Sequence, residues 1–173
     1  MTTVPVSLGE RSYEVRIEPG LLGRAGEILE SYAGKQPFVI VTDENVAAQP
    51  SFWTLYNSLS SVGPAPQVIK LPAGEGTKSW AQLEALTDRL IELGVERSDH
   101  VIAFGGGVIG DLVGFAASVV KRGCNFIQIP TTLLAQVDSS VGGKTAINSH
   151  AGKNLIGAFH QPALVLIDPD TLD

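Results

Sequence analysis

The stretch HVIAFGGGVIGD, residues 100–111, gives the strongest indication of the fold. It opens with an apolar run, 100–104, that leads directly into the glycines 105–107. The residues that follow, 108–120, are small and apolar, as in a buried helix. A buried strand, a glycine turn and a buried helix in this order predict one unit of a layered α/β domain.

Strand-like and helix-like segments alternate on both sides of this unit. Short apolar runs rich in β-formers predict strands at 37–42, 67–71, 125–129 and 163–168. Helical spacing predicts helices at 21–32, at 45–61 with Pro50 as a break or first-turn residue, and at 83–93 before Gly94. Because the strands are continuous apolar runs, we expect both faces of the sheet to be covered. The predicted fold class is an α/β, Rossmann-like layered domain with a mostly parallel sheet.

Two segments depart from this alternation. Residues 4–8 and 13–18 flank a short turn and lean towards alternating polarity, which predicts an N-terminal β-hairpin. Residues 131–160 are long, polar and glycine-rich, without a strong period. We expect that segment to be irregular and functional, with room for a short helix over 131–140.

Composition excludes several classes of protein. The chain has 173 residues, of which 44% are hydrophobic and 17% charged, and this suits one domain or a little more. No apolar run reaches the roughly 20 residues of a membrane span, and the N-terminus has no secretory signal pattern. The single cysteine, Cys124, excludes an internal disulfide framework, so we expect a reduced, cytoplasmic setting and a buried thiol. The net charge of −6 argues against nucleic-acid binding.

The local charge of the glycine-rich half has the opposite sign. Between residues 100 and 160, the basic side chains outnumber the acidic ones: Lys121, Arg122, Lys144 and Lys153 against Asp111 and Asp138. This distribution favours a small anionic ligand, phosphate above all. A dipole-compensating role at the end of the helix is sufficient to explain Lys121 and Arg122.

The glycine turn has the spacing of a phosphate-binding loop. Gly105, Gly107 and Gly110 fit G-x-G-x-x-G, a spacing that lets a pyrophosphate approach the backbone at a helix N-terminus. The usual acidic residue about 20 positions later is missing, because Thr131 stands there. The acid that follows a strand is Asp43, upstream. A turn that serves only helix–sheet packing is the alternative.

Two further loops carry candidate ligand-binding side chains. In LPAGEGTKS, 71–79, Glu75 and Lys78 could hold ribose hydroxyls, although spacing alone favours a plain connection with solvated charges. In the segment 129–162, two threonines follow a strand, and four polar residues suited to a polyhydroxylated anion lie among the glycines: Asp138, Lys144, Lys153 and Asn154. A surface loop with solvated lysines is the alternative. GGKT at 142–145 lacks the upstream glycine of a P-loop, and the three histidines form no metal-binding pattern.

Three of these stretches resemble the 3-dehydroquinate synthases of the shikimate pathway: GGGVIGDLVGFAASVVKRG (105–123), IPTTLLAQVDSSVGGKTAIN (129–148) and GKNLIGAFHQP (152–162). The resemblance extends over essentially the whole chain. It implies a carbon–oxygen lyase that converts 3-deoxy-D-arabino-heptulosonate 7-phosphate to 3-dehydroquinate and phosphate, with catalytic NAD and a divalent metal, zinc or cobalt. Alternatives are a related NAD-dependent sugar-phosphate cyclase, a polyol dehydrogenase, or a non-catalytic nucleotide-binding module.

The resemblance also implies roles for individual residues. The NAD site would comprise Asp43, Ala73, Gly74, Glu75, Gly76, Thr77, Lys78, Gly106, Gly107, Val108, Ile109, Gly110, Asp111, Thr131, Thr132, Lys144 and Lys153. The catalytic and substrate-contacting set would be Asp138, Lys144, Lys153, Asn154 and Arg122. Arg122 would contact phosphate in a neighbouring subunit, which implies a homodimer.

Family members continue into a helical domain that supplies the metal ligands, and this chain has none of those ligands. Residues 1–173 therefore resemble an N-terminal NAD-binding domain that is inactive alone.

Overall fold

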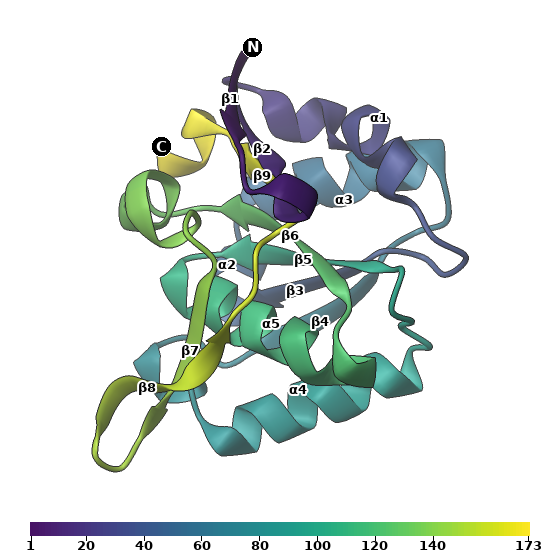
Figure 1. Cartoon of the computed structure of the whole chain (residues 1–173). Coiled ribbons are helices and arrows are strands. Elements are labelled where there is room, and N and C mark those ends of the chain that lie inside the picture. The colour runs from purple at the N-terminus through teal and green to yellow at the C-terminus, as the bar shows by residue number, and fades with distance from the viewer.

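The computed structural model describes all 173 residues, and its centre is a seven-stranded sheet (Figure 1). The strands are β1 (Thr2–Val6), β2 (Tyr13–Ile17), β3 (Val39–Asp43), β4 (Gln67–Leu71), β5 (His100–Gly105), β6 (Asn125–Pro130) and β9 (Leu164–Ile167). Their order across the sheet is β1-β2-β9-β6-β5-β3-β4. All neighbours pair in parallel except β1 and β2, the antiparallel N-terminal hairpin. The predicted fold class and hairpin are confirmed.

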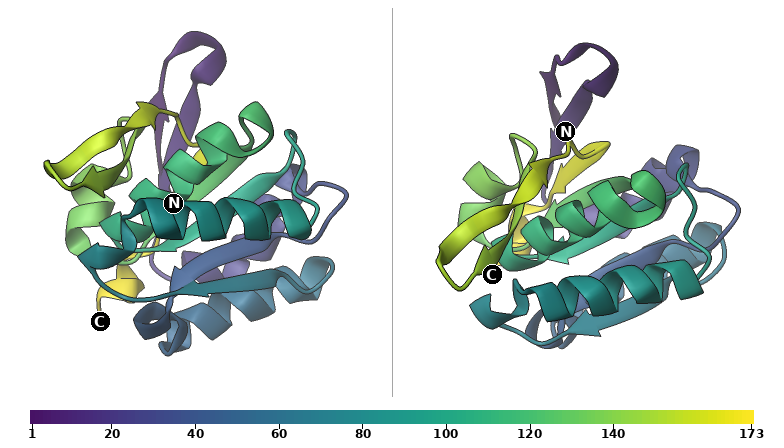
Figure 2. Two further views of the ribbon diagram at one scale, coloured as in Figure 1. Left: turned by 90° about the horizontal axis from the view of Figure 1, so that it is seen from below. Right: turned by 60° about the horizontal axis from the view of Figure 1, so that its bottom comes forward.

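Helices cover both faces of the sheet (Figure 2). They are α1 (Ala25–Leu29), α2 (Glu44–Ala47), α3 (Pro50–Val62), α4 (Trp80–Glu92) and α5 (Gly107–Val119). Successive strand residues alternate between two apolar cores, as the pleat requires. Val39 and Val41 face the core shared with α4 and α5, whereas Ile40 faces the core shared with α1 and α3.

Proline and glycine residues set several helix boundaries. Pro50 is the first residue of α3, where its missing N–H costs nothing. Gly94, which follows α4, adopts a left-handed φ of 80° that suits a helix end. The single helix predicted over 21–32 is wrong in part, because α1 lies between two 3₁₀ turns, Leu21–Arg24 and Glu30–Tyr32. No helix combines the length and the apolar character needed to cross a membrane.

The expectation of an irregular segment over 131–160 is wrong for its second half, whereas the short helix allowed for over 131–140 is present. A short π-helix, Ala135–Ser139, is followed by an antiparallel hairpin of β7 (Lys144–Ser149) and β8 (Gly152–Phe159). Thr145 and Ile147 are buried on the side of β7 that packs against α5. Gly114 of α5 makes room for Thr145, since a Cβ there would overlap its methyl group. The hairpin is thus stabilised by non-local packing.

The path of the chain creates a switch point between β3 and β5. From β3 the chain passes outward to the edge strand β4, and then returns to β5 on the other side of β3. In open α/β sheets, ligands bind outside the carboxyl ends of strands at such a point.

Candidate functional site

Four predicted site segments lie at the carboxyl edge of the parallel sheet. Asp43 is the last residue of β3, the loop 72–79 follows β4, Gly105 ends β5, and Thr131 and Thr132 follow β6. The Thr131 N–H donates to the Gly105 carbonyl (3.0 Å), which joins two of these segments directly. The parallel arrangement therefore gathers residues that are far apart in sequence.

The glycine turn serves both packing and exposure of backbone donors. A Cβ on Gly105 would lie 2.8 Å from Ile109, and one on Gly110 would lie 2.5 Å from Gln128 Oε1. These glycines are required for helix–sheet contact, as the packing interpretation expects. Gly106 caps α5 without any side-chain hydrogen bond, so the first N–H groups of this 13-residue helix have no side-chain acceptor. Such a helix end favours an anion.

Asp43 has a local structural role that leaves it partly available. Its Oδ1 accepts from the N–H groups of Asn45 and Val46, both at 2.8 Å, and so caps α2. Its second oxygen, Oδ2, accepts no hydrogen bond within the chain. One carboxylate oxygen therefore fixes the orientation while the other can accept from a ligand hydroxyl.

A buried charge network lies beside the glycine turn. The Lys78 side chain is only 4% exposed, so the interpretation of a solvated lysine is wrong. Its Nζ donates to Asp111 Oδ2 (2.8 Å) and to Asn154 Oδ1, and lies 3.9 Å from Glu75 Oε1. Burial raises the pKa of Asp111, while the hydrogen bond and charge of Lys78 act in the opposite direction. The ion pair thus links the loop 72–79 to α5, and the hydrogen bond to Asn154 links the same loop to β8.

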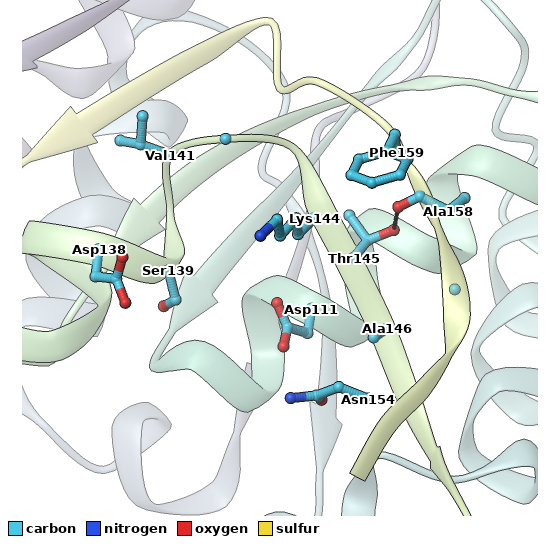
Figure 3. A pocket seen from close by; sticks show the side chains of 12 residues that line it. Asp111, Asp138, Ser139, Val141, Lys144, Thr145, Ala146, Asn154, Ala158 and Phe159 are labelled. Carbon is cyan, nitrogen blue, oxygen red and sulfur yellow. Dashed lines mark hydrogen bonds between the residues drawn. The ribbon is translucent and has the colours of Figure 1, made fainter.

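A cavity of about 640 Å³ opens against this network (Figure 3). Polar side chains from four elements surround the space: Asp138 and Ser139 from the π-helix, Lys144 from β7, Asp111 from α5 and Asn154 from β8. The remaining lining residues are Val141, Gly142, Thr145, Ala146, Gly157, Ala158 and Phe159.

Two charged side chains of the cavity are unpaired. Lys144 and Asp138 take part in none of the ion pairs or side-chain hydrogen bonds of the chain. A π-helix, rare in itself, often marks a functional position. The cavity therefore offers a free ammonium group, a free carboxylate and an amide from three different elements.

Two predicted catalytic residues lie away from the cavity. Lys153 is exposed on β8 and is not among the lining residues. Arg122 lies beyond the opposite end of α5, roughly 20 Å along the helix from the glycine turn. Lys121 and Arg122 have left-handed φ values of 53° and 63°, conformations that carry strain in non-glycine residues.

Sequence reasoning missed several contributors to the site. Ser139, Val141 and Phe159 line the cavity, and Asn148 connects the β7–β8 hairpin to the loop 72–79. A second hollow of about 390 Å³ is lined by the predicted loop residues Glu75, Gly76 and Lys78 together with Trp80, which was not predicted. Asn148 and Phe159 gave no signal in the sequence, because the β7–β8 hairpin that positions them was not predicted.

His160 and Cys124 contact the body of the domain and do not line the cavity. The His160 ring nitrogen Nε2 lies 2.8 Å from the Cys124 carbonyl, and its ring stacks on Phe126. Cys124 is buried, which confirms the expectation, and this burial raises the pKa of its thiol to about 11. Nowhere do three or more His, Cys, Asp or Glu side chains gather as a metal-binding group.

Comparison with known proteins assigns the chain to a family. Residues 68–173, more than half of the chain, match the family model described as 3-dehydroquinate synthase N-terminal. The chain belongs to this family. It is 61% identical over 172 residues to the 3-dehydroquinate synthase of Zymomonas mobilis, covering 98% of this chain and 45% of that protein. The chain therefore spans about half the length of the curated relatives it matches.

Solved structures of related cyclases share the fold. A 2-deoxy-scyllo-inosose synthase in complex with carbaglucose-6-phosphate, NAD+ and Co²⁺ matches with a TM-score of 0.86 and 28% identity, over 99% of this chain and 46% of that one. A 2-epi-5-epi-valiolone synthase from Streptomyces hygroscopicus with NAD+ and Zn²⁺ matches at 0.85 and 32%, over 96% and 46%.

Proposed function

We propose that residues 1–173 form the NAD+-binding domain of a 3-dehydroquinate synthase. The reaction would convert 3-deoxy-D-arabino-heptulosonate 7-phosphate to 3-dehydroquinate and phosphate, and the substrate class is a phosphorylated sugar acid. The observation that carries the proposal is the cavity at the carboxyl edge. There, the unpaired Lys144 and Asp138 share a cavity with Ser139. Ser139 packs against Gly107, the first residue of α5, so the cavity lies next to the N-terminus of that helix.

The cofactor site suits a dinucleotide on physical grounds. The uncapped N-terminus of α5, residues 106–110, offers N–H groups to a pyrophosphate, and the free Oδ2 of Asp43 can accept from a ribose hydroxyl. Lys78 of the loop 72–79 donates to Asp111 in the first turns of α5, and Asp111 also lines the cavity. NAD+, when bound, supplies reversible oxidation of a substrate hydroxyl by hydride transfer.

The substrate-binding roles fall to the polar side chains of the cavity. Lys144 would bind a phosphate or carboxylate as a point charge, and Asp138 would accept from a hydroxyl group. Asn154 would present its amide to the polyol. Lys153, exposed nearby on the same strand as Asn154, would add positive charge at the entrance.

The position of Arg122 beyond the end of α5 supports a role for this residue in a homodimer. It lies too far along α5 to reach the cavity of its own chain, and its backbone just after the helix is left-handed. We propose that it contacts the substrate phosphate in the site of a second subunit.

No ligand set for zinc or cobalt is formed by these residues. We therefore assign the metal no ligand in this chain and propose that the 173 residues are inactive alone.

A chimera tests the proposed function. This chain would replace the matching N-terminal segment of the Zymomonas mobilis relative, 61% identical to it. We expect NAD+-dependent phosphate release from the heptulosonate phosphate without net NADH. Lys144→Met should reduce the release, whereas the matched change at an exposed lysine outside the site, Lys35→Met, should not. A folded chimera that releases no phosphate would contradict the proposal. Net NADH formation from polyols would instead indicate a dehydrogenase.

A further inference from the structure

The β8 strand contains a distortion at the edge of the cavity. The register of the β7–β8 ladder shifts between the pairs Ile147↔Ile156 and Ser149↔Gly152. One residue of β7, Asn148, therefore faces three residues of β8, 153–155. Asn154 in the middle of this bulge has a left-handed φ of 59°. Bulges next to functional sites re-aim a side chain, and here the bulge brings the Asn154 amide to Lys78 Nζ.

Asn148 makes three hydrogen bonds that tie this bulge to the loop 72–79. Its Oδ1 accepts from the backbone N–H of Asn154 (3.0 Å), and its Nδ2 donates to Glu75 Oε1 (3.1 Å). Its own backbone N–H donates to the Lys78 carbonyl (2.9 Å). These partners fix the amide orientation, because a flipped amide would oppose N–H to N–H and carbonyl oxygen to carboxylate.

We infer that Asn148 is a positioning residue that holds the Asn154 bulge in its left-handed conformation. It thereby sets where the Asn154 side chain and the Lys78 ammonium meet at the wall of the cavity. The bond to Glu75 couples the same bulge to the other side of Lys78. The identity of the ligand that benefits rests on the proposed function, whereas the positioning itself can be tested without ligand.

The ligand-free test measures amide exchange by NMR on the ¹⁵N-labelled chain. Asn148→Ala removes the acceptor, so the Asn154 N–H should exchange at least about tenfold faster, and the Lys78 Nζ resonance should shift. Asn148→Asp keeps the acceptor but sets two carboxylates against each other, so Asn148→Asp/Glu75→Gln, which restores a donor–acceptor pair there, should preserve the Asn154 protection. The control is Asn57→Ala on the exposed face of α3. Unchanged Asn154 exchange in Asn148→Ala, or equal acceleration at Ile147 and Ile156, would overturn the inference, because the latter indicates general loosening of the hairpin.

The second readout is calorimetric titration with NAD+. We expect Asn148→Ala to weaken NAD+ binding roughly fivefold to tenfold. The double variant Asn148→Ala/Asn154→Ala should bind no more weakly than Asn154→Ala alone, because Asn148 acts through Asn154. Additive losses would overturn the inference. If the wild-type chain binds no NAD+ while Asn154 exchange responds as expected, the positioning role stands and the proposed cofactor site fails.

Discussion

Replacing Lys78 by methionine isolates the buried charge network at the centre of the site. Methionine keeps the length and apolar stem of the side chain but removes the ammonium group. Asp111, whose side chain is 18% exposed, then loses the cation that lies 2.8 Å from its Oδ2. Asn154 loses the same donor. The substitution therefore leaves a mostly buried carboxylate without a counter-charge.

The expected cost follows from this burial. Removing one partner of a buried ion pair destabilises proteins by roughly 3–5 kcal/mol. Because Asp111 keeps some exposure, we expect the lower end, a loss of about 3 kcal/mol in the free energy of unfolding. For a chain of this size the midpoint temperature would fall by roughly 6–12 °C. In Lys78→Met/Asp111→Asn no buried charge remains unpaired, since Glu75, which also loses Lys78, is 43% exposed. Most of the stability should therefore return, leaving a deficit of about 1 kcal/mol for lost hydrogen bonds.

Urea unfolding followed by circular dichroism measures these differences. Burial raises the pKa of Asp111, and loss of Lys78 would raise that pKa further. A carboxyl group with a raised folded pKa is tolerated while protonated and costs stability as the pH rises through that pKa. The deficit of Lys78→Met should therefore grow between pH 4 and pH 7, and exposed Lys35→Met is the control. A deficit independent of pH, or a double variant no more stable than Lys78→Met, would refute the reasoning.

Three further outcomes follow from packing and burial. Gly114→Ala should destabilise by about 1–3 kcal/mol in urea unfolding, because its Cβ would overlap Thr145, whereas Gly23→Ala, with open space around it, should not; equal effects would contradict the packing account. Burial lowers the pKa of His100, so the wild type should lose stability as the pH falls from about 7 to 5 and His100→Gln should lose less; parallel pH curves would refute this. With a pKa of about 11, buried Cys124 should react with a disulfide reagent at pH 8 only after urea is added. Prompt reaction of the folded chain would contradict the burial of this thiol.

The elements that local patterns describe were predictable from the sequence. The strand expected at 67–71 is β4, Gln67–Leu71, and Pro50 begins α3. Continuous apolar runs such as 100–104 predict strands covered on both faces, and the two cores on either side of the sheet confirm it. In each case the information lies within one element.

The β7–β8 hairpin could not be predicted in the same way. Its strands contain lysine, asparagine and glycine, which have low β-propensity. Only Thr145 and Ile147 mark a buried face, and their partner is α5, about 30 residues earlier in the chain. The bulge at Asn154 also breaks the period that would have identified β8.

The site also combines residues that local motifs identify with contacts that only the fold creates. Asp138, Lys144 and Asn154 lie around one cavity, but nothing in the spacing of these residues places Asp111 there. The bonds of Lys78 to Asp111 and Asn154 join residues separated by 33 and 76 positions. A lysine in a polar loop resembles a solvated one until the fold brings a carboxylate to it. The roles of all the predicted site residues, Lys153 and Arg122 included, stay predictions.

The most direct test of the account is a calorimetric titration of NAD+ into the purified 173-residue chain, with circular dichroism to verify folding. The account predicts saturable binding of one NAD+ per chain, because the glycine turn, Asp43 and the Lys78 network are all formed within these residues. A folded chain that binds no NAD+ would contradict it, and would show that residues outside this chain are needed to complete the cofactor site.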